Sequence, residues 1–176
     1  MGNFNFKQFP ELVTKRLVLR QPCASDSKSL YQLRTNRKIN KLISRKIPQN
    51  IKETTKFIAE LNKRFEDKKN IFWVIVSKEH RRVIGSIAYH NFNHNFTYAE
   101  IGYELHPNEH LKGFMSESCK AVLNFGMYTM NLTTIEAFTH KNNEASKALL
   151  KKHKFIFQNE RREKGFDYNR IFQLKK

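Results

Sequence analysis

The sequence has few of the residues that build disulfide, metal or membrane proteins: only 2 of its 176 residues are Cys, 4 are Pro and 6 are Gly. Cys23 and Cys119 lie far apart and form no metal-ligand spacing, so we expect two reduced thiols in a cytosolic protein. No apolar run approaches the roughly 20 residues of a membrane-spanning helix. Residues 1–7 lack the hydrophobic block of a signal peptide. We therefore expect a cytoplasmic protein with no membrane partner.

Acidic residues are also scarce, with 16 Asp and Glu against 33 Lys and Arg and a net charge of +17. This charge attracts polyanions. It would serve a phosphate-bearing cofactor, an RNA-rich neighbourhood such as the ribosome, or only a solvated lysine-rich surface. The basic residues are spread along the chain, which favours the solvated surface.

The hydrophobic content of 39%, with 15 Phe, predicts a packed globule. A single α/β domain over residues 1–176 is expected at this length. Alternating or apolar segments predict strands, and apolar residues at helical spacing predict helices. Gly85 inside a strand indicates a bulge or close packing. The expected strands are 14–21, 72–76, 82–90, 98–105, 134–139 and a final hairpin of 155–161 with 168–174; the expected helices are 26–36, 51–65, 114–130 and 143–150.

The central stretch predicts a strand over residues 98–105, a short loop and a helix from Phe114. Pro107 ends the strand because it cannot donate to a ladder. A loop between a strand end and a helix start gathers free backbone N–H groups at the positive end of the helix dipole. Such a place binds anions, and phosphate is a common ligand.

This stretch carries a family resemblance. Residues 99–103 read Ala-Glu-Ile-Gly-Tyr, residues 110–115 read His-Leu-Lys-Gly-Phe-Met, and Asn143 and Ser146 follow the next strand. The pattern resembles the GNAT acyl-CoA N-acyltransferase superfamily, in the branch that acetylates ribosomal-protein N-termini, over about residues 12–174. The resemblance implies the GNAT fold: a central, mostly antiparallel, twisted sheet of six to seven strands flanked by about four helices.

The resemblance also implies an acetyl-CoA site, and the sequence itself predicts no metal site. Leu111 stands where the family often has a first glycine, and Gly113 keeps the second. The histidines are not spaced like a metal set. The amides of the loop would hold the CoA diphosphate, and pantetheine would pair along the end of the central strand. The implied cofactor-binding residues are Leu105, His106, His110, Leu111, Lys112, Gly113, Phe114, Met115, Asn143 and Ser146.

Acyl transfer needs a neutral amine, and an α-amine with a pKa of about 7.7–8.0 needs a weaker base than a lysine with a pKa of about 10.4. Glu100 and Glu104 share one strand face and are the candidates for this base. In the family the glutamate equivalent to Glu100 is often given this role. The alternative is that both carboxylates are solvated or paired with Lys and Arg.

The thiolate that leaves CoA gains from a hydrogen bond. Many superfamily members place a tyrosine seven residues after the helix-start Asn, but this chain has Leu150 there. The ribosomal-protein branch offers a serine instead, here Ser146. The alternative for Asn143 and Ser146 is an ordinary helix cap.

We therefore expect direct attack of an amine on the thioester, without a covalent enzyme intermediate. The acceptor that the resemblance implies first is a protein N-terminus, with association with the ribosome as a partner. A small amine or antibiotic is the alternative acceptor. A basic RNA- or ribosome-binding module without turnover is the alternative of another class, and a homodimer is left open.

Overall fold

The computed structural model describes residues 6–176 and contains one eight-stranded sheet in the order β1-β2-β3-β4-β5-β6-β8-β7. All neighbouring strands are antiparallel except β5 and β6, which are parallel. The expected mixed α/β fold with a mostly antiparallel sheet is confirmed. The described residues form eight strands and five α-helices, more than the six to seven strands and about four helices that were expected.

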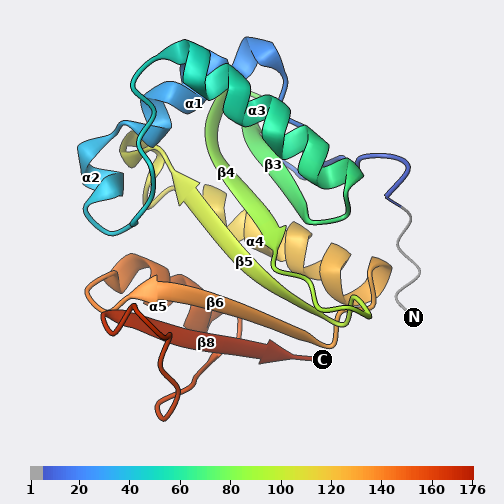
Figure 1. Cartoon of the computed structure of the whole chain (residues 1–176), viewed down its shortest axis with the longest axis vertical. Coiled ribbons are helices and arrows are strands. Elements are labelled where there is room, and N and C mark those ends of the chain that lie inside the picture. The colour runs from blue at the N-terminus through green and yellow to red at the C-terminus, as the bar shows by residue number, and fades with distance from the viewer. Residues whose placement is uncertain (1–5) are drawn as a thin grey trace.

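The elements follow one another along the chain (Figure 1). The strands are β1 (Leu12–Val13), β2 (Leu17–Arg20), β3 (Asn70–Ser77), β4 (Arg82–His90), β5 (Tyr98–Leu105), β6 (Thr134–His140), β7 (Ile156–Phe157) and β8 (Asn169–Lys175). The α-helices are α1 (Ser27–Arg34), α2 (Arg37–Asn40), α3 (Ile51–Glu66), α4 (Phe114–Asn124) and α5 (Glu144–Lys152).

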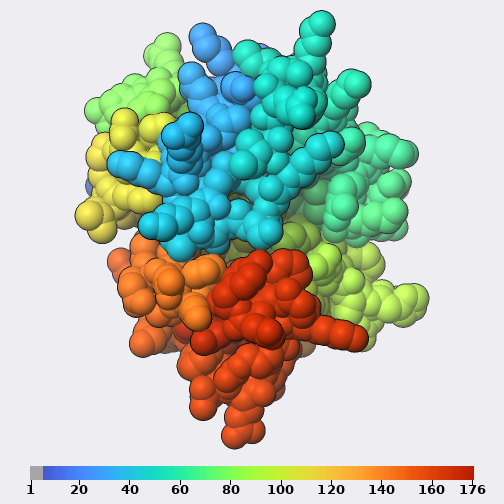
Figure 2. Space-filling model, turned by 60° about the vertical axis from the view of Figure 1, so that its left-hand side comes forward, coloured from blue at the N-terminus to red at the C-terminus, as the bar shows by residue number. Residues whose placement is uncertain are grey.

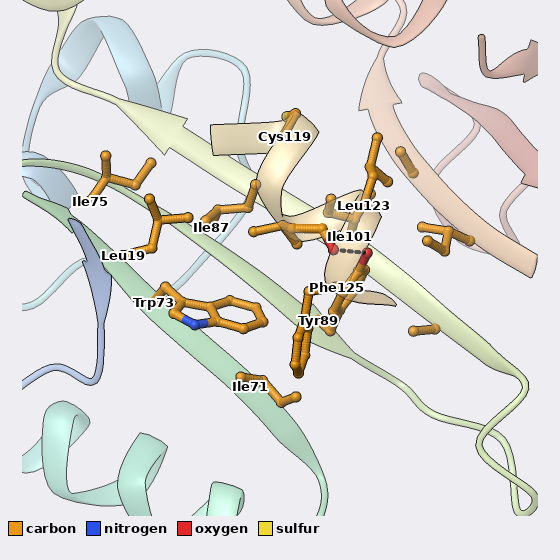
Figure 3. Packing of buried hydrophobic residues seen from close by; sticks show 14 of the residues in the cluster. Leu19, Ile71, Trp73, Ile75, Ile87, Tyr89, Ile101, Cys119, Leu123 and Phe125 are labelled. Carbon is orange, nitrogen blue, oxygen red and sulfur yellow. Dashed lines mark hydrogen bonds between the residues drawn. The ribbon is translucent and has the colours of Figure 1, made fainter. Parts of the chain in front are cut away.

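Helices cover both faces of the sheet, with α1 and α3 on one face and α4 on the other (Figure 1). Trp73 lies at the centre of the larger core, and its ring packs edge-on against Tyr89 and Phe125. Figure 3 shows this packing, with the Tyr89 hydroxyl donating to the backbone carbonyl of Val122. The smaller core joins α1 and α3 to the sheet through Leu30, Leu33, Ile58 and Val74. The two cores fix the central strands between the helices.

Local sequence signals set several boundaries. The spacing of Asn50 and Glu53 in the sequence predicts a capping box at the start of α3, and the Asn50 side chain does accept from the backbone N–H of Glu53. The Glu53 carboxylate in turn accepts from Gln49 rather than from Asn50, so the expected capping box is displaced by one residue. The helix expected over 114–130 ends at Asn124 and continues as a π-turn over Phe125–Thr129. The strand expected over 155–161 is reduced to Ile156–Phe157.

The structure has a bulge and close packing at Gly85, as expected. The register between β3 and β4 shifts between Ile75 and Val76, opposite this glycine. A Cβ added at Gly85 would lie 2.5 Å from the backbone oxygen of Glu104 in β5. Because that oxygen belongs to the backbone, a side chain at Gly85 would push β4 and β5 apart.

We expect Gly85→Ala to lower the free energy of unfolding by about 1–3 kcal/mol, as overpacking does in other cores. Gly102→Ala is the matched control, because its Cβ would meet only His90 at an ordinary 3.7 Å. The control should change the free energy of unfolding by less than about 1 kcal/mol. Urea denaturation of both variants measures the difference, and equal values for the two would contradict the packing argument.

Candidate active site

The site lies where β5 and β6 part. They pair only at Tyr98 with Thr134, Ala99 with Ile135 and Glu100 with Glu136. Past these residues β5 continues to Leu105 beside β4, and β6 continues beside β8, so the sheet opens between them (Figure 1). The family resemblance implies that the strand ending at Leu105 splays from the strand at 134–139, and the pairing confirms this.

The backbone of β5 presents polar groups to this opening. The N–H of His106 donates to Ile84 of β4, and alternate residues of a strand direct their backbone groups to opposite sides. The N–H and C=O groups of Tyr103 and Leu105 therefore point away from β4, and all but the Leu105 carbonyl, which contacts His110, face the opening without a partner in the part of the chain that the structure describes. An extended chain, such as pantetheine with its two amides, fits such an edge. In the space-filling view, residues 36–50 lie on one side of the opening and α5 with the chain after it on the other (Figure 2).

The first turn of α4 provides free donors at one end of the opening. Gly113 is its N-cap, in the left-handed conformation with φ +79°, and glycine has no side chain to bond the first N–H groups. Leu111 also takes a left-handed conformation, with φ +62°, and its side chain is fully exposed. It therefore takes the backbone shape that glycine favours and turns its side chain outwards, so that it does not fill the loop. These features fit the diphosphate of CoA.

An ion pair between Arg16 and Glu117 holds this loop in place. Glu117, in the first turn of α4, accepts from the backbone N–H of Arg16 and pairs with its guanidinium at 2.6 Å. Arg16 also donates to the carbonyl of Lys112 at 2.9 Å and lies over the Phe114 ring. Its guanidinium brings a positive charge next to Gly113, a contribution that sequence reasoning missed because Arg16 lies almost 100 residues away.

The charge of Lys112 is engaged by the loop itself. Its ammonium lies 3.1 Å from the carboxylate of Glu109, which is buried and also pairs with Arg82 at 2.6 Å. Burial by itself raises the pKa of Glu109, but Lys112 and then Arg82 hold that pKa below its ordinary value. Lys112 therefore holds the loop in shape as well as adding positive charge.

The two loop histidines bond the neighbouring backbone. The Nδ1 atom of His106 accepts from the N–H of Asn108 and caps a short 3-10 turn over Pro107–Glu109. The Nε2 atom of His110 lies 2.9 Å from the carbonyl oxygen of Leu105, at the end of β5. Both rings thus fix the turn after β5. Met115 follows Phe114 in the first turn of α4 and packs against the main core.

Of the two candidate bases, Glu104 is fully engaged. Its side chain is 6% exposed and pairs with Arg45 at 2.6 Å, and the hydroxyl of Ser86 donates to its other oxygen at 3.3 Å. Arg45 belongs to the irregular segment between α2 and α3, which gave no sequence signal for this contact. Glu104 therefore follows the alternative that the sequence left open, a carboxylate paired with an arginine.

Glu100 is held more loosely. Its side chain is 20% exposed, lies 3.8 Å from Nδ1 of His90 and accepts a long 3.4 Å hydrogen bond from Tyr98. The Tyr98 hydroxyl donates at 3.0 Å to Glu136, the residue opposite Glu100 on β6. Burial first, and then the charges of these two carboxylates, raise the pKa of Tyr98 well above its ordinary value. Tyr98 therefore stays a neutral donor between the two acids.

Glu136 differs from Glu100 because it has strong partners. Arg161 forms a two-point ion pair with it, and Gln173 donates at 2.7 Å. Burial by itself raises the pKa of Glu136, but its hydrogen bonds, first the one from Arg161, hold the pKa below the ordinary value. Glu136 is therefore a fixed negative charge, whereas no arginine of the described residues pairs with Glu100.

Asn143 and Ser146 lie at the start of α5, on the other side of the opening. Asn143 is the N-cap, and its side-chain oxygen accepts from the N–H of Ser146 at 3.1 Å. The Ser146 hydroxyl lies 2.9 Å from the hydroxyl of Tyr103 on β5. Leu150 is buried in the core. The capping geometry is present, and Tyr103 is a partner of Ser146 that sequence reasoning missed.

Neither cysteine is placed to act as a nucleophile. Cys119 is buried in α4, and burial raises the pKa of its thiol to about 12. Cys23 is exposed near the start of α1, beside Ser25 and Asp26. Within residues 6–176 no three Cys, His, Asp or Glu side chains are grouped as metal ligands would be. In that same range no helix is both long and apolar enough to cross a bilayer.

We expect a thiol reagent to modify Cys23 rapidly in the folded protein and Cys119 only after unfolding, because the thiolate is the reactive form. Counting thiols with a chromogenic disulfide at pH 8, with and without urea, measures this. One thiol should react before urea and two after. The enzyme with Cys23 blocked by this reagent should keep its turnover, and loss of turnover at this step would contradict the absence of a cysteine nucleophile.

The chain matches known proteins over most of its length. Residues 16–156 match the model of the acetyltransferase (GNAT) domain. The uncharacterized N-acetyltransferase YoaA of Bacillus subtilis (strain 168) is 31% identical over 144 residues, which cover 82% of this chain and 81% of that protein. The structure of ribosomal-protein-S5-alanine acetyltransferase from Vibrio fischeri aligns with a TM-score of 0.82 at 16% identity, covering 94% of this chain and 96% of that one.

A further solved structure has a bound cosubstrate. Microcin C7 self immunity acetyltransferase MccE, in complex with acetyl-CoA and AMP, aligns with a TM-score of 0.78 at 20% identity and covers 93% of this chain and 94% of that one. These structural likenesses support the fold, and the family model and the Bacillus relative establish the family. The chain belongs to the GNAT acetyltransferase family and is an N-acetyltransferase.

Proposed function

We propose that this enzyme transfers the acetyl group of acetyl-CoA to the α-amine at a protein N-terminus. The similar structures include a ribosomal-protein acetyltransferase and an enzyme solved with acetyl-CoA. The cosubstrate would lie in the opening between β5 and β6, with its diphosphate at the N–H groups after Gly113 and near Arg16. Asn143 and Ser146 would flank it from α5.

Glu100 carries the proposal for the chemistry. Three carboxylates lie on or beside this face of the sheet, and two of them, Glu104 and Glu136, are buried and paired with arginines. Glu100 alone of the three is partly exposed and lacks an arginine partner. It would accept the proton of the attacking amine, directly or through a water molecule.

A carboxylate base is better suited to an α-amine acceptor than to a lysine acceptor. With a pKa of about 7.7–8.0, roughly a tenth of α-amines are neutral at pH 7. Lysine amines are neutral in fewer than about one molecule in a thousand at that pH. An N-terminal α-amine therefore needs only a weak base such as Glu100, and this supports a protein N-terminus over a lysine side chain as the acceptor.

Substitution separates the two candidate glutamates. We expect Glu100→Gln to lower kcat/KM for an N-terminal peptide about a hundredfold or more at pH 7, the range of general-base catalysis. The loss should shrink at pH 9, where the α-amine is already neutral. Release of free CoA thiol, measured with a library of N-terminal peptides, gives these values.

Glu104→Gln is the matched control, because it removes an equal charge from the same strand face. It should lower the melting temperature, since it leaves the half-buried Arg45 without its partner, and change kcat/KM by only a few-fold. A Glu104→Gln enzyme that folds normally but loses turnover, beside an active Glu100→Gln enzyme, would reverse the assignment. Turnover with small amines and none with any peptide would refute the N-terminal acceptor.

A further inference from the structure

The hydroxyl groups of Tyr103 and Ser146 join the two sides of the opening. Tyr103 extends from β5 and Ser146 from the first turn of α5, 43 residues later, and their oxygens lie 2.9 Å apart. Few other contacts connect β5 to α5 at this point, because β5 and β6 no longer pair beyond Glu100. The pair therefore lies where the sheet opens, beside the proposed path of pantetheine.

We propose that Tyr103 is a positioning residue of acetyl transfer, whose phenol donates to Ser146 Oγ and so directs the Ser146 hydroxyl hydrogen at the sulfur of the departing CoA. The inference rests on the proposed function, because it deepens the role of Ser146. It also places a tyrosine hydroxyl at this site from β5, whereas position 150 on α5 holds a leucine in the core.

The direction of the hydrogen bond follows from the chemistry of the two groups. Each hydroxyl can donate one hydrogen and accept others. The phenol is the more acidic of the two and hence the stronger donor. Burial raises the pKa of Tyr103, so the phenol keeps its proton at neutral pH. With Oγ occupied as an acceptor by Tyr103, the single hydrogen of Ser146 is left to point at a third atom.

The step balances without proton transfer from either hydroxyl. The amine nitrogen forms a bond to the thioester carbon, the carbon–sulfur bond breaks, and its electron pair goes to sulfur. The amine proton goes to Glu100 or its water. The sulfur leaves as a thiolate, whose ordinary pKa is near that of a free thiol, about 8.5, and takes its proton from solvent. Ser146 and Tyr103 stabilise the negative charge on sulfur through hydrogen bonds.

A double-mutant cycle tests this coupling. We expect Tyr103→Phe and Ser146→Ala each to lower kcat about tenfold to a hundredfold, with the peptide KM within about twofold of the parent value. The double variant should be no slower than the slower single variant, because both substitutions break one chain of hydrogen bonds. Single effects that multiply in the double variant would overturn the coupling. A Tyr103→Phe enzyme with parental kcat would overturn the role of Tyr103.

Tyr89→Phe is the matched control for the loss of a buried phenol hydroxyl. Tyr89 donates to the carbonyl of Val122 inside the core, away from the opening. This variant should lower the melting temperature and leave kcat unchanged. If Tyr89→Phe slowed turnover as much as Tyr103→Phe, a general loss of stability would explain both, and the positioning role would be refuted.

A measurement without an acceptor separates this inference from the proposed function. The thiol of bound CoA is titrated through its thiolate absorbance in the ultraviolet, in the parent and in each variant. We expect the pKa of the bound thiol to be about one unit higher in Tyr103→Phe and Ser146→Ala, a tenfold change. If the unsubstituted enzyme lowers the pKa of the bound CoA thiol relative to the variants but acetylates no peptide, only the proposed acceptor is refuted. An unchanged thiol pKa in Tyr103→Phe, or no binding of CoA, would sink the inference.

Discussion

The short parallel contact between β5 and β6 is the constraint on which the rest of the site depends. It lasts three residue pairs, from Tyr98 with Thr134 to Glu100 with Glu136. Each strand is then held by its outer neighbour, β4 on one side and β8 on the other. Because those ladders are long and antiparallel, the opening is a fixed feature of the sheet. Backbone groups of β5 that a complete sheet would pair, such as those of Tyr103, therefore face the opening.

The same contact brings the ionisable groups together. Pairing Glu100 with Glu136 sets two carboxylates side by side, where like charges repel. The structure resolves this by giving Glu136 an arginine from the segment before β8 and a glutamine from β8 itself. Tyr98 joins the two acids through its hydroxyl. The two acids therefore differ: Glu136 is buried and held by strong partners, and Glu100 is partly exposed and held by longer contacts.

Local signals in the sequence predicted local structure well. The helix caps at Asn50 and Asn143 depend on contacts within three residues, so their residue types sufficed. The placement of Glu100 and Glu104 on one face needed only the two-residue period of a strand. The positions of the central strands along the chain and the loop before Phe114 followed from apolar patterns and from the family resemblance. The fold and the location of the site were accessible from the sequence for this reason.

Contacts between distant segments were not accessible in this way. Arg45 lies in an irregular segment with no periodicity, so nothing in its neighbourhood indicated that it would pair with Glu104. Tyr103 belongs to the strand motif of residues 99–103. The contact of its hydroxyl with Ser146 depends on the angle at which β5 diverges from β6. The contact of Arg16 with the start of α4 likewise depends on the pairing of β2 at the far side of the sheet. The spacing of residue types along the chain gives no information about the angles between strands.

The burial of several acidic side chains affects how the large positive charge of the chain is distributed. Asp26, Glu104, Glu109 and Glu136 are buried, whereas no lysine or arginine is buried within residues 6–176. Each of these acids pairs with an arginine that reaches inwards from a more exposed position. These four acids are therefore covered, and the lysines and arginines, which give the chain its net charge of +17, lie nearer the solvent. The field outside the protein is accordingly set mainly by cations, and such a field raises the local concentration of a ligand that carries phosphates. Together with the free N–H groups after Gly113, this charge distribution favours the anionic end of CoA at the open side of the sheet.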